Sequence, residues 1–326
     1  MSKKRPRDLI REASRMLSSA SYCPKKLTAI HAGIAATVSL VVALLTYLLG
    51  IGIGETTGLG GISKLAALET AQTVLRVAIA IFGPFWSLGF IAAVIHLARG
   101  QAATPSTLLA GFHRWGAALR LMILETLIYC IATFSTMQLG AYIYALTSAA
   151  DELFALMDQL VNIDADALYN LLSTLDYNTV IRLFWGMLPF FFLLPLVVVI
   201  LLSYRLRLAQ YILMDDPRVG ARLAVAISIR LTKKNCLRLF ALDLRFWWFY
   251  LLEGLVQVVC YGDLLLPMFG VELGMNAALA SFLFYILAMV CQVGLYAWQK
   301  PRVFTSYALF YDDLLPRQMP EQGAAN

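Results

Sequence analysis

Residues 190–203 have the sequence FFFLLPLVVVILLS, the most hydrophobic stretch of the chain. They lie inside a longer apolar segment, 183–204, which has the roughly 20 residues that a helix needs to cross a bilayer. Pro189 and Pro195 fall within this segment. We expect them to kink its helix, as prolines do in membrane spans. The stretch therefore predicts a membrane-spanning helix.

Five further segments pass the same length test. The six candidate spans are 27–51, 74–98, 117–147, 183–204, 238–261 and 277–299. Apolar residues make up 60% of the 326 residues and charged residues only 14%, a composition outside the usual range of soluble proteins. The sequence predicts an all-α fold, a polytopic helical membrane bundle of about six transmembrane helices.

Charge alternates along the segments between these spans. Four stretches contain 22 of the 26 Lys and Arg residues and 7 acids: 1–26, 99–120, 203–238 and 300–326. Three stretches between them contain 2 basic residues and 10 acids: 52–73, 148–182 and 262–275. Short loops rich in Lys and Arg stay on the cytoplasmic side. The pattern predicts a multi-pass protein of the cell membrane with both termini in the cytoplasm.

The segments outside the spans complete the predicted organisation. We expect a membrane domain at 27–314 and a disordered tail at 315–326. Within the domain, 148–182 is an acidic outer insertion with two short helices, and 203–238 is a basic cytoplasmic loop. The turn-forming residues early in this loop predict a helix that begins at 221.

Residues 1–26 form a basic amphipathic segment before the first span. Leu9, Ala13 and Met16 fall on one face of a helix, with arginines on the others, which predicts a helix lying in the inner membrane interface. Basic side chains here and in the loop 203–238 are expected to contact anionic lipid headgroups. The predicted headgroup contacts are Lys3, Lys4, Arg5, Arg7, Arg11, Arg15, Lys233 and Lys234.

The chain resembles a family of bacterial integral membrane proteins known as domain of unknown function 975. The residues that carry the resemblance are Leu97, Ala98, Arg99, Gly100, Gly111, Phe112, Ala209, Tyr211, Ile212, Leu213, Asp216, Pro217, Ser228, Lys233, Phe240, Leu244, Phe246, Trp247, Pro301, Ala308, Phe310 and Tyr311. This chain departs from the family pattern at Asn235, where a glycine is expected, at Arg302, and in its enlarged acidic segment 148–182. The resemblance implies a multi-span helical bundle and no particular reaction.

Motifs that carry chemistry are absent from the sequence. It contains no Walker loop, no GxSxG elbow and no HExxH motif. The five cysteines lack CxxC spacing, and the three histidines are scattered over separate segments. We therefore predict no catalytic residue, no bound cofactor and no metal site, and expect a protein that is not an enzyme.

Ionisable residues inside the spans are the remaining candidates for function, because charge in a bilayer is costly unless it is paired or hydrated. They are Arg76, Glu125, Asp243, Arg245 and Glu253. They either pair to fix helix register or line a substrate path. A rise of about 1.5 Å per residue places Arg76 level with Glu253 and Glu125 level with Arg245. We predict these two ion pairs.

Three functional classes follow from these observations. The first is a non-enzymatic bundle that binds lipid or a membrane protein partner and serves envelope maintenance, with anionic lipids on the cytoplasmic side as ligands. The second is a small-solute or ion-coupled transporter, and the third an intramembrane enzyme. Nucleic acid is not an expected partner, because no separate basic domain exists to hold it.

Overall fold

The computed structural model describes residues 4–53, 59–148, 150–151, 154, 177–262, 265–266 and 277–315. Over these residues the chain is helical and contains no strand. Five helical stretches of the described residues are long and apolar enough to cross a membrane: Pro24–Leu45, Ile81–Ala98, Trp115–Ala145, Phe184–Asp215 and Leu279–Leu314. The predicted all-α membrane bundle is confirmed.

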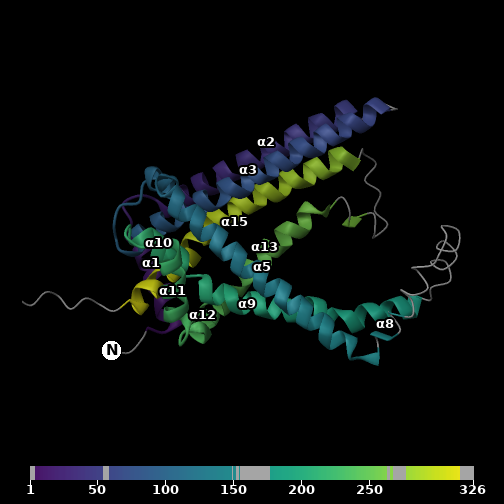
Figure 1. The fold of residues 1–326 in the computed structure, drawn as a ribbon. Coiled ribbons are helices and arrows are strands. Elements are labelled where there is room, and N and C mark those ends of the chain that lie inside the picture. The colour runs from purple at the N-terminus through teal and green to yellow at the C-terminus, as the bar shows by residue number, and fades with distance from the viewer. Residues whose placement is uncertain are drawn as a thin grey trace, which may run out of the picture. The chain divides into compact units, whose positions relative to one another are not determined.

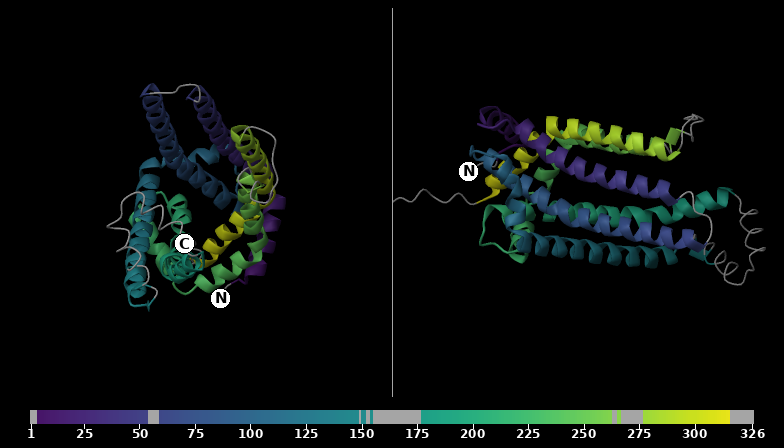
Figure 2. Two further views of the ribbon diagram at one scale, coloured as in Figure 1. Left: turned by 90° about the vertical axis from the view of Figure 1, so that its right-hand side faces the viewer. Right: turned by 90° about the horizontal axis from the view of Figure 1, so that it is seen from above.

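The chain forms two compact units, residues 1–121 with 208–326, and residues 122–207. The helices of the first unit are α1 (Pro6–Ser19), α2 (Pro24–Ile53), α3 (Leu59–Ala98), η1 (Pro105–Leu109), α4 (Ala110–His113), α10 (Ala209–Asp215), α11 (Ala221–Thr232), α12 (Cys236–Asp243), η3 (Leu244–Phe246), α13 (Trp247–Cys260) and α15 (Ala277–Leu314). Helix α5 (Trp115–Ala145) begins in this unit and continues into the second. Figures 1 and 2 show α2, α3 and α15 side by side in the first unit, and each of the three contacts the other two.

The core of the first unit lies where α3 meets η1, α4 and α15. Phe90 and Phe310 are almost fully buried there. A Cβ atom on Gly89 would lie 1.7 Å from the Leu108 carbonyl oxygen, so only glycine lets η1 approach α3 this closely. Gly100, with φ at +70°, then turns the chain at the end of α3, a conformation that glycine adopts without strain.

The second unit contains the remainder of α5 with α8 (Tyr177–Leu188), η2 (Pro189–Leu193) and α9 (Leu194–Leu206). The segment η2 is a π-helical turn. The regular helix is thus interrupted between the two prolines for which a kink was predicted, as π turns and prolines both do. A Cβ atom on Gly140 would lie 2.4 Å from the Phe190 carbonyl oxygen, so glycine permits the close contact of α5 with η2.

The predicted fifth span, 238–261, is not one continuous helix. It is divided into α12 and α13 by the 3-10 turn η3. At 14 residues, α13 is about 21 Å long, shorter than the roughly 30 Å hydrocarbon core. Leu239 and Leu242 of α12 are fully buried in the protein. By length and composition, the described residues contain five of the roughly six predicted spans, and 238–261 is not among these five.

Helix α1 confirms the helix predicted near the N-terminus, but its apolar face has a different neighbour. Leu9 and Ala13 are fully buried, and α1 packs on α15, α12 and α3. Protein rather than lipid covers this face, because the stripe of α1 matches an apolar face at the end of α15.

Two further helix boundaries bear on the site. Helix α11 matches the helix expected from residue 221. Helix α15 continues through Pro301 to Leu314, well beyond the predicted end of the sixth span at 299. Most of the acidic insertion 148–182 and the tail from 316 onward lie outside the described residues.

Candidate functional site

Two of the predicted intramembrane acids bind tyrosines of α15. Asp243, the last residue of α12, accepts a hydrogen bond from the Tyr307 hydroxyl. Glu253 of α13 accepts one from the Tyr296 hydroxyl, which itself accepts one from Gln292 Nε2 at 3.0 Å. These bonds connect the broken segment α12–α13 to α15. The sequence analysis found the acids but not their tyrosine partners.

The two predicted ion pairs stay predictions. Arg76 lies in α3, and its side chain falls outside the described residues. Arg245 is exposed on η3 in the first unit, whereas Glu125 is half-buried on the part of α5 that belongs to the second.

The predicted headgroup contacts fall into two groups. Six are exposed: Arg5, Arg7, Arg11, Arg15, Lys233 and Lys234. Lys4 is half-buried, and its ammonium group pairs with Glu12 at 2.6 Å. Lys3 lies outside the described residues. The exposed residues can reach a membrane surface, while Lys4 is engaged within the protein.

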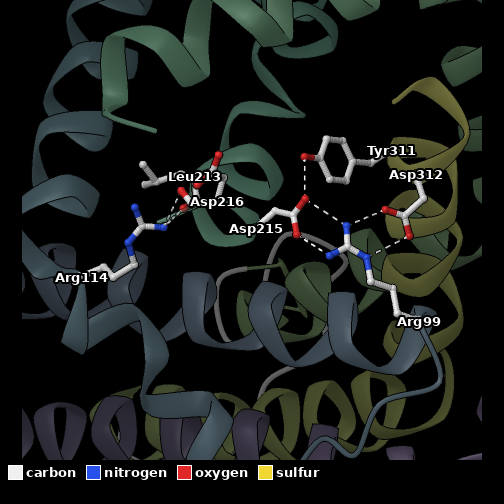
Figure 3. A network of polar contacts seen from close by, with 7 residues as sticks. All are labelled: Arg99, Arg114, Leu213, Asp215, Asp216, Tyr311 and Asp312. Carbon is white, nitrogen blue, oxygen red and sulfur yellow. Dashed lines mark hydrogen bonds and ion pairs between the residues drawn. The ribbon is translucent and has the colours of Figure 1, made fainter. Parts of the chain in front are cut away.

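Arg99 is the centre of a paired cluster at the end of α3 (Figure 3). Its guanidinium group forms ion pairs with Asp215 of α10 and with Asp312 of α15, the latter at 2.8 Å. The Tyr311 hydroxyl donates to the second oxygen of Asp215 at 3.0 Å. The hydrogen bonds to Asp215 raise the pKa of Arg99 further above its ordinary value. The cluster fixes three helices to one another.

Two further arginines of the first unit also connect helices to one another. Arg114 donates to the Leu213 carbonyl near the end of α10 and to the Asp216 and Pro217 carbonyls just after it. It therefore caps that helix (Figure 3). Arg238 of α12 pairs with Asp313 of α15 and donates to the Lys4 carbonyl. Both cations are bound to protein groups, although Arg238 Nη1 has no hydrogen-bond partner among the described residues, and we interpret them as structural.

Many residues that carry the family resemblance belong to this framework. Ala209, Tyr211, Ile212 and Leu213 form the buried face of α10. Asn235, where a glycine was expected, has an ordinary φ of −126° and donates to the Leu231 carbonyl at 2.7 Å. The departure therefore introduces no backbone strain.

A cavity of about 260 Å³ lies between α2, α3 and α15. Its walls are mostly apolar, with polar side chains that include His31, Gln292, Tyr296 and Lys300. The Lys300 Nζ atom lies 4.3 Å from the centre of the Tyr296 ring and 5.3 Å from that of Phe90. An apolar cavity with a few convergent polar groups is the usual form of a ligand site. It is the candidate functional site of this protein.

His31 is the most enclosed polar group of this cavity, at 4% exposure. Its ring stacks against Trp86, with centroids 5.3 Å apart, and against Phe90 at 4.6 Å. The Trp86 indole nitrogen donates to the His31 carbonyl at 2.9 Å. Neither ring nitrogen of His31 has a hydrogen-bond partner in the described part of the chain.

Sequence reasoning did not single out the residues of this cavity. Lys300 was counted with the loop that follows the last span, and His31 with the scattered histidines. One signal was present: Gln292, Tyr296 and Lys300 recur at intervals of four in an otherwise apolar segment, which places them on one helix face. Within the described residues, no group of three or more His, Cys, Asp or Glu side chains could hold a metal ion.

The long apolar helices define an all-helical integral membrane protein. The model of the family described as "Protein of unknown function (DUF975)" matches residues 26–318, and the chain belongs to this family. The resemblance seen in the sequence is thereby confirmed. No curated protein and no solved structure matches the chain.

Proposed function

We propose that this protein is a non-enzymatic membrane bundle that binds a membrane lipid in the cavity between α2, α3 and α15. The cavity itself is the observation that carries the proposal. Its volume is close to the lower end of the roughly 300 to 1,000 Å³ of small-molecule sites, enough for part of a lipid but not for a whole one. Binding a lipid of its own membrane would suit a role in envelope maintenance.

The test fills the cavity and measures retained lipid. Ala35 lines the cavity on α2, whereas Val41 of the same helix does not line it and is 51% exposed. After mild extraction, native mass spectrometry of the wild type should detect bound lipid, and Ala35→Phe should lose it. Val41→Phe, the matched control, should retain it. Equal retention in both variants, or no lipid on the wild type, would reject the proposal.

The orientation with both termini in the cytoplasm is part of this proposal and is supported by the distribution of charge between the spans. It predicts that a single cysteine at Asn170, a position outside the described residues, reacts with an impermeant maleimide in intact cells. A cysteine at Arg222 of α11 should react only after lysis. Both variants need a background without the five native cysteines. The reverse labelling pattern would overturn the orientation.

A further inference from the structure

Lys300 is a cation that forms no ion pair with any residue the structure describes. Its ammonium group lies over the rings of Tyr296, Phe90 and Phe304, between 4.3 and 5.5 Å from their centres. In the described part of the chain it forms no ion pair, and Glu253, on the far side of Tyr296, is bonded to that tyrosine. Aromatic faces stabilise a cation without neutralising it. The described residues thus leave the Lys300 ammonium group without a carboxylate bound to it, and open to another partner.

His31 gives a second, independent observation at the same place. Its ring and the Lys300 ammonium group both contact Phe90, so they lie near one another at the cavity wall. A buried imidazole without hydrogen bonds is unfavourable, because its nitrogens have lost water and gained no replacement. A neutral imidazole offers one N–H donor. A ligand with an acceptor oxygen would satisfy it.

The cavity has its cation at one end and is longer than a headgroup. Along α15, its lining extends from Lys300 back to Met289, eleven residues or about 16 Å. Along α2, it extends from His31 to Ser39, eight residues or about 12 Å. Alanines and valines cover much of the wall between these ends. A cationic end followed by a mostly apolar wall, with Gln292 and Ser39 farther along, suits an amphiphile with a negative head.

We propose that the cavity takes an amphiphile with a single negative charge, whose headgroup oxygens contact Lys300 Nζ and the His31 ring. This inference rests on the proposed function and names the ligand class. One cation with an acid close behind Tyr296 favours one negative charge over two. A phosphodiester and a fatty-acid carboxylate share this chemistry, and the apolar chain would extend toward Met289.

The test compares lipids with the same acyl chains and the same phosphodiester but a different net headgroup charge. The full-length protein in detergent is mixed with dioleoylphosphatidylglycerol and dioleoylphosphatidylcholine, and native mass spectrometry gives the occupancy of each. The wild type should prefer phosphatidylglycerol by about tenfold or more, as one charge-assisted hydrogen bond provides. Lys300→Gln should abolish the preference while phosphatidylcholine still binds. His31→Phe should reduce it without affecting chain binding.

Lys233→Gln is the matched control, because Lys233 is exposed on the protein surface and does not line the cavity. It should leave the preference unchanged. If Lys300→Gln keeps the wild-type preference, or Lys233→Gln removes it equally, surface charge explains the selectivity and the inference is wrong. Loss of all lipid from the wild type would instead reject the proposed function.

Two competitors identify the source of the anion. Oleate supplies a carboxylate on an apolar chain, and sodium phosphate supplies a free anion with no chain. Displacement of phosphatidylglycerol by oleate at micromolar concentration, with no effect of phosphate, supports an amphiphile. Displacement by phosphate alone would show a site for a free anion and overturn the assignment.

Discussion

Two polar regions of α15 differ in whether their charged side chains form ion pairs. Near its C-terminal end, Asp312 and Asp313 are bound by Arg99 and Arg238. Twelve residues earlier, about 18 Å along the helix, the Lys300 ammonium group lies over three aromatic rings and forms no ion pair within the described part of the chain. Helix α15 thus contains two acids in ion pairs and one lysine without an ion pair among the described residues.

The difference separates charges that specify the fold from charges that are available to a ligand. Paired ions fix which helices meet, although their net stabilisation is modest, because removing either partner leaves an uncompensated charge. A cation inside a membrane span without an ion pair is costly, and under the proposal above a bound ligand offsets that cost. The two regions should therefore respond to substitution with opposite signs.

The largest effect is expected at Arg99. Arg99→Ala leaves Asp215 and Asp312 without their cation and should lower the free energy of unfolding by about 2 kcal/mol. Breaking a fully buried pair costs ~3–5 kcal/mol. The value here is smaller because the Arg99 side chain is 33% exposed. Thermal unfolding in a fixed detergent measures it as a lower Tm. Arg302→Ala, at an exposed arginine of the same helix α15, is the control. Equal Tm values for the two variants would show that the cluster contributes nothing.

A smaller effect is expected at the second pair, and it can be isolated by a double-mutant cycle. Arg238→Ala should cost more than Asp313→Ala, because Arg238 also donates to the Lys4 carbonyl. The double variant should recover part of the loss, with a coupling of about 1 kcal/mol. Combining Arg238→Ala with Arg302→Ala, which share no contact, should give additive losses. Additivity in the Arg238–Asp313 cycle as well would mean that the observed pair has no energetic role.

The opposite sign is expected at Lys300. Lys300→Met keeps much of the side-chain volume and removes a half-buried cation without an acidic partner. In lipid-free detergent the free energy of unfolding should be unchanged or raised by up to about 1 kcal/mol, since binding sites commonly trade stability for function. Thermal unfolding would show this as an unchanged or higher Tm. A fall in Tm as large as that of Arg99→Ala would place Lys300 with the structural charges and end the contrast between the two regions.

The sequence predicted what depends on local composition. Apolar length and alternating loop charge are enough for an all-helical membrane bundle, and the helix that includes Leu9 and Ala13 follows from their spacing. The broken segment at η3 was missed because its hydropathy, with Trp247 and Phe249, equals that of a span. What interrupts it is packing of α12 inside the protein, which composition does not report.

The polar contacts between helices, and the place of Lys300 in the candidate site, were out of reach for a different reason. Arg99 is 116 residues from Asp215 and 213 from Asp312, and no local pattern encodes such a meeting. Depth along the spans gave candidate pairs for Glu253, but its observed partner is a tyrosine hydroxyl, a group that charge counting ignores. Lys300 was assigned to a loop after the last span, and the proline that follows it normally favours the end of a helix. Helix α15 instead continues past Pro301.

The smallest effect concerns the ion pair between Lys4 and Glu12, which lies outside both regions of α15. Their side chains are 37% and 30% exposed, so water competes with the pair and salt screens it. Glu12→Gln should change the stability by less than about 0.5 kcal/mol, measured by the same thermal unfolding assay at low and high ionic strength. A loss comparable to that of Asp313→Ala, persisting in high salt, would contradict this expectation. An exposed ion pair would then stabilise the protein as much as a buried one. The difference between the paired acids of α15 and Lys300 would depend on the presence of a partner alone, and not on burial of the pair.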